Sequence, residues 1–135
     1  MILGFKNKFI GSIQDGTKFH TIRQDYNDRW KPGNTIHFSS GVRTKAMQIF
    51  KVGKCITIQK ILIQVQPDGY SDCIIDGVKM SLIEKHILAA NDGFDNFEQL
   101  LTFFFPKIKP PFLDKNKNEK FIFSGKIIHW TNYKY

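Results

Sequence analysis

The 135-residue chain has few cysteines, and its two thiols, Cys55 and Cys73, form no Cys-x-x-Cys pair. Disulfide scaffolds need several cysteines and zinc ribbons need closely spaced pairs, so this content argues against both classes. Each cysteine lies in an apolar, β-like stretch, where a free thiol is usually a small buried group. A disulfide between them, or a metal site that includes one, is the less favoured interpretation.

Motifs for common cofactors are also missing. The four histidines show no metal-ligand spacing such as His-x-x-x-His, and no acidic or cysteine cluster completes a ligand set. The sequence contains no Walker loop, no Gly-x-Gly-x-x-Gly and no Gly-x-Ser-x-Gly. We therefore expect neither a metal nor a cofactor.

No apolar run reaches the roughly 20 residues that a membrane helix needs. The first nine residues, MILGFKNKF, contain too short an apolar run for a signal-peptide core. These absences predict a cytoplasmic protein with no membrane partner. The length fits one domain, over 1–135, with a single hydrophobic core, and a monomer is favoured.

Acidic residues are scarce in the first half of the chain. Residues 1–60 contain 11 Lys and Arg against 3 Asp and Glu, whereas residues 61–135 contain 9 of each. The whole formal net charge of +8 therefore lies in the first half. A one-sided basic surface attracts polyanions, so nucleic acid is the first partner to consider. Lysine that serves only solubility is the alternative.

The apolar pattern predicts a short helix, five or six strands, two helices and a last strand. The short helix is expected over 7–15, with Asn7 as its cap and Gly16 as its stop. Strands are expected at 18–24, 35–39, 46–50 and 55–66, on both sides of an Asp76-Gly77 turn, and at 121–130. Residues 51–54 are expected to link two strands, and residues 107–120 to form an exposed loop.

Two helices are predicted before the last strand. The first begins with a capping box at Ser81 and is expected to present Ile83, Ile87 and Leu88 to the core. The second begins at Asp95, and its expected inner face and end are marked by Phe97, Leu101, Phe104 and Pro106. The fold class is therefore mostly β with helices (α+β). The expected architecture is a small, mainly antiparallel barrel with a helical insertion before the last strand.

The segment GTKFHTIR, residues 16–23, concentrates hydrogen-bonding side chains. In a regular strand Thr21 and Arg23 share one face, and Lys18 and His20 share the other. Lys18 and Thr21 converge only if Lys18 still belongs to a turn at Gly16 or if a bulge intervenes. A lysine beside a hydroxyl could then act as its base, with a carboxylate to orient it. The alternative is a surface strand with solvated side chains.

This segment matches the Gly-x-Lys-x-x-Thr-x-Arg signature of the ASCH family, a branch of the PUA-like β-barrels, and the chain resembles that family over nearly its whole length. A short helix precedes the segment, and a Pro-Gly turn and a strand follow it. The stretch EKHILAANDGFDNFEQLLTFF, with its Asp-Gly-Phe step, is similar to the family's helical segment before the last strand.

The resemblance implies RNA binding in the cleft that contains the segment. It also implies an alternative, because some small bacterial ASCH proteins are amidohydrolases that deacetylate acetylcytidine. Their catalytic lysine and threonine correspond to Lys18 and Thr21, and Arg23 completes the signature. Asp92 stands where those enzymes have a glutamate, and Glu84 is a weaker substitute.

Other residues extend the expected cleft. Trp30, between Arg29 and Lys31, could stack on a base or could instead cover one end of the barrel. Arg43 lies in a glycine loop that could surround a phosphate or only turn the chain. The predicted ligand is RNA or a modified nucleoside, bound by Lys18, His20, Thr21, Arg23, Arg29, Trp30 and Arg43. The enzyme alternative uses Thr21 as nucleophile, Lys18 as base and Asp92 as acid.

Overall fold

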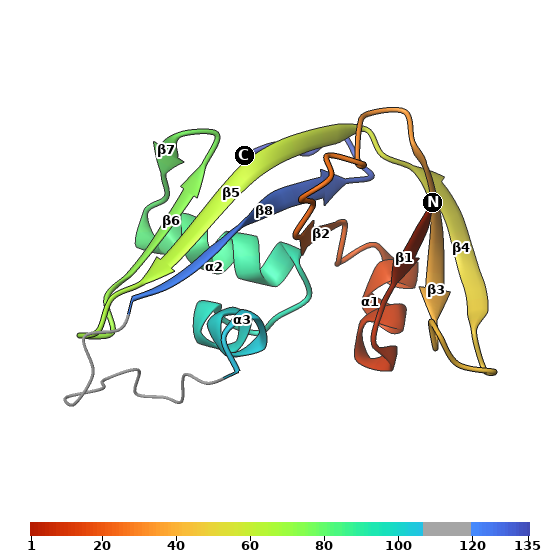
Figure 1. The fold of residues 1–135 in the computed structure, drawn as a ribbon, viewed down its shortest axis with the longest axis horizontal. Coiled ribbons are helices and arrows are strands. Elements are labelled where there is room, and N and C mark those ends of the chain that lie inside the picture. The colour runs from red at the N-terminus through yellow and green to blue at the C-terminus, as the bar shows by residue number, and fades with distance from the viewer. Residues whose placement is uncertain (107–119) are drawn as a thin grey trace.

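In a computed structural model, which describes residues 1–106 and 120–135, the chain is an α+β protein with two sheets and three α-helices (Figure 1). Strand pairing is antiparallel in both sheets except between the first strand and its neighbour. Within the described residues, no helix has the length and apolar character required to cross a bilayer.

The smaller sheet has the order β1-β3-β4, with β1 over Ile2–Gly4, β3 over Thr35–Ser40 and β4 over Gln48–Lys54. β1 runs parallel to β3 with Leu3 opposite Phe38, and both side chains are buried. The predicted link at 51–54 was wrong, because these residues pair with β3 and belong to β4.

The larger sheet has the order β2-β8-β5-β6-β7. Its strands are β2 (His20–Arg23), β5 (Thr57–Val65), β6 (Ser71–Ile75), β7 (Val78–Lys79) and β8 (Phe121–His129). The predicted Asp76-Gly77 hairpin is confirmed, because both residues have positive φ, as a type I′ turn requires. β8 pairs with both β2 and β5, so the last strand joins the GTKFHTIR segment to the rest of the sheet.

A 3₁₀ turn at Asn7–Phe9 leads into α1, Ile10–Asp15. The predicted stop is confirmed, because Gly16 follows the helix in a left-handed conformation with φ of 86°. The predicted cap was wrong. Asn7 lies inside the 3₁₀ turn, Lys6 precedes that turn, and no side chain caps it.

The helix α2, Leu82–Asn91, has the predicted capping box at Ser81. Its predicted inner face was only partly right, since Leu88 is buried but Ile83 is 73% and Ile87 is 42% exposed. The helix instead buries Lys85 one turn before Leu88. The ammonium of Lys85 donates to the backbone oxygen of Ser71 at 2.7 Å, so its stem packs in the core while the ammonium keeps a hydrogen bond.

The helix α3, Phe97–Phe104, begins later than predicted, because Asn96 rather than Asp95 caps it. Phe97 and Leu101 are buried as expected. In Figure 1, α2 and α3 lie on one side of the long strands β5 and β8, at the end away from the smaller sheet. These two helices precede β8, which confirms the predicted helical insertion before the last strand.

The described strands form two sheets, and they do not close into one barrel. The predicted loop at 107–120 falls almost wholly outside the described residues, which omit 107–119. Cys55 and Cys73 are free and buried, as expected of small apolar thiols. Burial raises the pKa of Cys55 to about 11 and that of Cys73 to about 12, so both remain protonated at neutral pH.

Candidate functional site

Lys18 belongs to the turn after α1 and not to a strand. The left-handed Gly16 reverses the chain, and the backbone N–H of Lys18 donates to the backbone oxygen of Ser12 at 2.9 Å. β2 begins only at His20, so strand alternation does not separate Lys18 from Thr21. Both residues line one cavity. Lys18 therefore lies in a turn at Gly16, which is the geometry that lets it approach Thr21.

The ammonium of Lys18 is almost completely buried, and its side chain is 2% exposed. It donates to Asp92 Oδ1 at 2.8 Å, to the Asp92 backbone oxygen at 2.6 Å and to the His20 backbone oxygen at 2.9 Å. These three acceptors match the three protons of an ammonium. Asp92, at the end of α2, is thus the carboxylate that meets Lys18, as the resemblance implied.

The ion pair strongly affects both partners. Burial lowers the pKa of Lys18, and Asp92 only partly opposes this effect. Burial alone would raise the pKa of Asp92, but the charge of Lys18 and the neighbouring His20 outweigh it and hold that pKa below its usual value. Asp92 is therefore ionised at neutral pH.

His20 is fully buried behind Asp92, and its Nδ1 lies 3.3 Å from Asp92 Oδ1, poorly aligned for a hydrogen bond. Its Nε2 lies 2.5 Å from the hydroxyl of Tyr135, which in turn accepts from Asn91 Nδ2 at 3.0 Å. Because the Asn91 amide donates to the phenol oxygen, the phenol proton is free for Nε2. This arrangement places the imidazole proton on Nδ1, facing Asp92.

Thr21 and Arg23 form a second polar group in the same cavity. Arg23 Nε donates to Thr21 Oγ1 at 3.2 Å, and Arg23 Nη2 donates to the Gly4 backbone oxygen at 2.5 Å. Among the described residues, no hydrogen bond joins Thr21 to Lys18. A guanidinium beside a hydroxyl stabilises negative charge on its oxygen, so Arg23 favours an alkoxide at Thr21.

The cavity has a volume of about 310 Å³ and is partly open to solvent, since Phe103 of its wall is 37% exposed. Lys18, Thr21, Arg23 and Asp92 supply polar groups, and the remaining wall is mainly aromatic. The aromatic rings belong to Phe5, Phe9, Phe94, Phe103, Phe104 and Phe123. Such a combination of aromatic walls with a few converging polar groups is typical of a small-molecule site.

Four predicted binding residues do not line the cavity, and one of them, His20, is fully buried behind Asp92. The stacking role of Trp30 was wrong, because its side chain is only 8% exposed and belongs to the hydrophobic core. Arg29 and Arg43 are exposed, but neither lines the cavity. In the glycine loop, the Thr44 hydroxyl donates to the Gly41 backbone oxygen at 2.6 Å, which closes the loop on itself.

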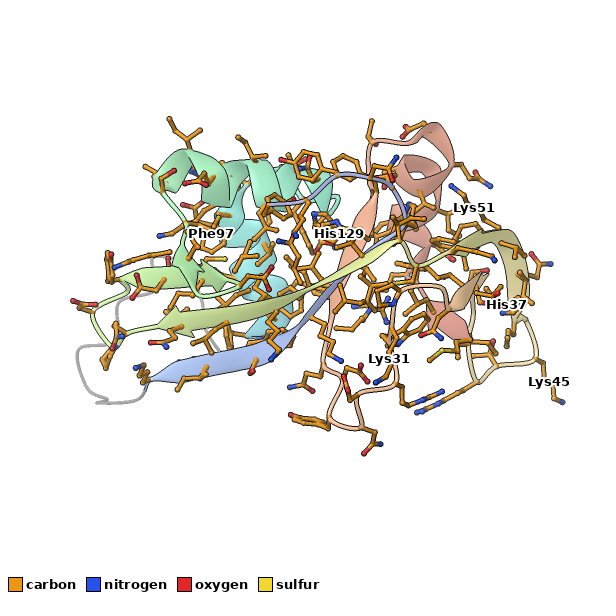
Figure 2. The ribbon with its side chains drawn as sticks, turned by 90° about the horizontal axis from the view of Figure 1, so that it is seen from above. Lys31, His37, Lys45, Lys51, Phe97 and His129 are labelled. Carbon is orange, nitrogen blue, oxygen red and sulfur yellow. The ribbon has the colours of Figure 1, made fainter. Side chains whose placement is uncertain are left out.

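The sequence did not predict the layer of buried polar side chains beneath the site, which contains Gln59 and His129. Gln59 on β5 accepts from the backbone N–H of Tyr135 at 2.9 Å and donates to the backbone oxygen of Tyr135 at 2.8 Å. Its Oε1 also lies 2.9 Å from His129 Nε2, in the middle of the molecule (Figure 2). The sequence signal of this layer was that Gln59 falls in alternation with the apolar residues Ile61, Ile63 and Val65 of its strand. It could not reveal its partner 76 residues away.

The buried histidines make stability depend on pH. Burial lowers the pKa of His129 to about 4, and it also lowers the pKa of His20. Between pH 6.5 and 4 these histidines bind protons in the unfolded chain but not in the folded chain. The free energy of unfolding therefore decreases as pH falls through this window. We expect His129 to contribute about 3 kcal/mol of this loss. Urea denaturation from pH 7 to 4 measures it, and His129→Gln should flatten the profile.

No three His, Cys, Asp or Glu side chains in residues 1–106 and 120–135 are grouped so that they could hold a metal ion. No protein-family model, curated protein or solved structure matches this chain. The functional assignment therefore rests on the cavity and on the residues around it.

Proposed function

We propose that the chain is an ASCH domain whose cavity binds one planar base, taken from RNA or from a modified nucleoside. The supporting observation is the aromatic cavity that encloses Lys18 and Thr21 of the family signature together with Asp92, which stands where the amidohydrolases of the family have a glutamate. On this proposal the two sheets correspond to the PUA-like barrel of that family, left open because no described strand of one sheet pairs with a strand of the other.

The size and chemistry of the cavity support a single base. A volume of about 310 Å³ is at the lower end for ligand sites and too small for a nucleic-acid duplex. Phenylalanine rings stack on the faces of a base, while the Thr21 hydroxyl and the Arg23 guanidinium can hydrogen-bond its edge. Arg23 uses two of its five N–H groups within the protein, so others remain for a ligand.

Calorimetric titration with the four ribonucleosides and N4-acetylcytidine tests the proposal. We expect at least one to bind, and Phe103→Ala to weaken that binding about tenfold, because Phe103 lies at the cavity mouth and is partly exposed. Tyr26→Ala is the matched control, since Tyr26 is an exposed aromatic residue that does not line the cavity. Failure of all five nucleosides to bind would contradict the proposal.

A second function, amidohydrolysis of an acylated cytidine, is favoured by the contact between Arg23 and Thr21. In this reaction Lys18 first passes a proton to Asp92 and becomes a neutral amine. Thr21 Oγ then attacks the acetyl carbonyl carbon, and the hydroxyl proton passes to Lys18 through a water or the substrate. The C–N bond then breaks, the cytosine amine takes the proton, and water hydrolyses the acetyl-threonine to acetate. Burial lowers the pKa of Lys18, which favours this base role.

Incubation with N4-acetylcytidine, followed by chromatography for cytidine and acetate, separates the two functions. An enzyme should release both products, and Thr21→Val should abolish their release. Thr17→Val is the control, because Thr17 belongs to the same segment but its hydroxyl is exposed and bonds Asp15 at 2.6 Å. Absence of product with intact nucleoside binding would contradict the enzyme function and leave the proposed binding function in place.

A further inference from the structure

Two lysines stand at the mouth of the cavity. Lys6 Nζ lies 5.0 Å and Lys8 Nζ 5.3 Å from the centroid of the Phe103 ring. Lys8 Nζ also lies 4.9 Å from the Phe9 centroid and 5.5 Å from the Phe94 centroid. Both ammonium groups are thus held over the aromatic rings that form the cavity wall. We call Lys6 and Lys8 the mouth lysines.

The mouth lysines have no acidic partner in the described residues. No carboxylate oxygen of residues 1–106 or 120–135 lies within 4.0 Å of either ammonium. Glu98 lines a groove on the outside of the cavity together with Lys6 and Lys8, but it forms no ion pair with either lysine. Two like charges near one ring repel each other, and an anion between them would relieve that repulsion.

The charges that line the cavity also favour an anionic ligand. Among residues 1–106 and 120–135, Asp92 is the only acidic residue that lines it, and its charge is already matched by Lys18. Arg23 lines the cavity as well and has no carboxylate within ion-pair distance among the described residues. The cavity and its mouth therefore carry an excess of positive charge, which favours an anionic ligand over a neutral one.

The cavity continues into the groove where the mouth lysines lie. Lys6, Phe94 and Phe103 line both the cavity and this outer groove, which also includes Lys8. A base between the aromatic rings would thus leave its attached sugar and phosphate pointing toward the two ammonium groups. An aromatic site followed by a cationic site matches the order of the base and the phosphate in a nucleotide.

We infer that the site takes a nucleotide, with the base in the aromatic cavity and a phosphate bound by Lys6 and Lys8. This inference rests on the proposed function, and it narrows the ligand from a nucleoside to a phosphorylated unit. The phosphate could come from a free nucleoside monophosphate or from an RNA strand, because the mouth lysines would bind either through the same ionic contacts.

Calorimetry with the best-binding nucleoside and its 5′-monophosphate tests the inference. At low salt we expect the monophosphate to bind about tenfold more tightly than the nucleoside. Lys6→Gln/Lys8→Gln should abolish that difference, whatever the change in nucleoside affinity that follows because Lys6 also lines the cavity. The control is Lys45→Gln/Lys51→Gln, which removes two lysines at the smaller sheet (Figure 2) and should preserve the difference.

Equal affinity for nucleoside and monophosphate would overturn the inference while leaving base binding intact. Failure of every nucleoside and monophosphate to bind would contradict the proposed function itself. A trinucleotide with the same central base distinguishes the two phosphate sources. Tighter binding than the monophosphate, lost in Lys6→Gln/Lys8→Gln, supports the inference with RNA as the source, and weaker binding supports it with the free nucleotide.

Discussion

Replacing Lys18 by methionine is expected to lower the free energy of unfolding by about 3–5 kcal/mol, because it leaves the Asp92 carboxylate buried without its cation. The loss of an ammonium with three acceptors adds unsatisfied oxygens to the same site. Urea denaturation at pH 7 measures the change.

The double variant Lys18→Met/Asp92→Asn should lose less than the sum of the two single variants, because no lone charge remains buried. Lys31→Met is the matched control. Lys31 also pairs with an aspartate, Asp28, at 3.2 Å, but both side chains are exposed, so its loss should change stability by less than about 1 kcal/mol. Equal losses in Lys18→Met and Lys31→Met would show that the buried pair carries no special energy.

Gly125→Ala is expected to lower the free energy of unfolding by about 3 kcal/mol. A Cβ at this position would lie 2.5 Å from the backbone oxygen of Arg23 and 2.8 Å from Cε1 of Phe123. The first contact is with backbone, so β2 and β8 would have to separate. That shift would move Arg23 and should weaken nucleoside binding as well, which calorimetry can detect beside urea denaturation.

Gly11→Ala provides the comparison for this glycine. Gly11 lies in α1, and a Cβ there would have nothing within 4 Å. Alanine in a helix is favoured over glycine, so this variant should gain about 0.5–1 kcal/mol. If Gly125→Ala proved as stable as the unchanged protein, the close approach of β2 to β8 would not constrain the site.

Local signals in the sequence predicted much of the fold. The capping box at Ser81, the Asp76-Gly77 turn and the stop at Gly16 each depend on neighbouring residues, and all three are confirmed. Errors arose where tertiary packing decides. Ile83 and Ile87 are apolar at helical spacing, yet they face outward because α2 packs on the sheet through Lys85 and Leu88.

The candidate site was predictable only in part. The segment and the family resemblance together identified Lys18, Thr21 and Asp92, which the structure places in one cavity. Neither source indicated that Arg23, rather than Lys18, contacts the threonine hydroxyl. The mouth lysines and their rings come from segments about 95 residues apart in the sequence, such as Lys6 and Phe103, and no local pattern reveals that contact.

The pairing of β2 with β8 has a consequence for the order of folding. Ile22 lies opposite Ile127, whereas the hairpins β3–β4 and β5–β6 join residues close in the sequence. Closing a long loop costs more entropy than closing a hairpin, so we expect the hairpins to form first and β2 to dock late. The cavity takes its walls from β1, β2, α3 and β8. Its capacity to bind a ligand should therefore appear only in the step that completes the fold.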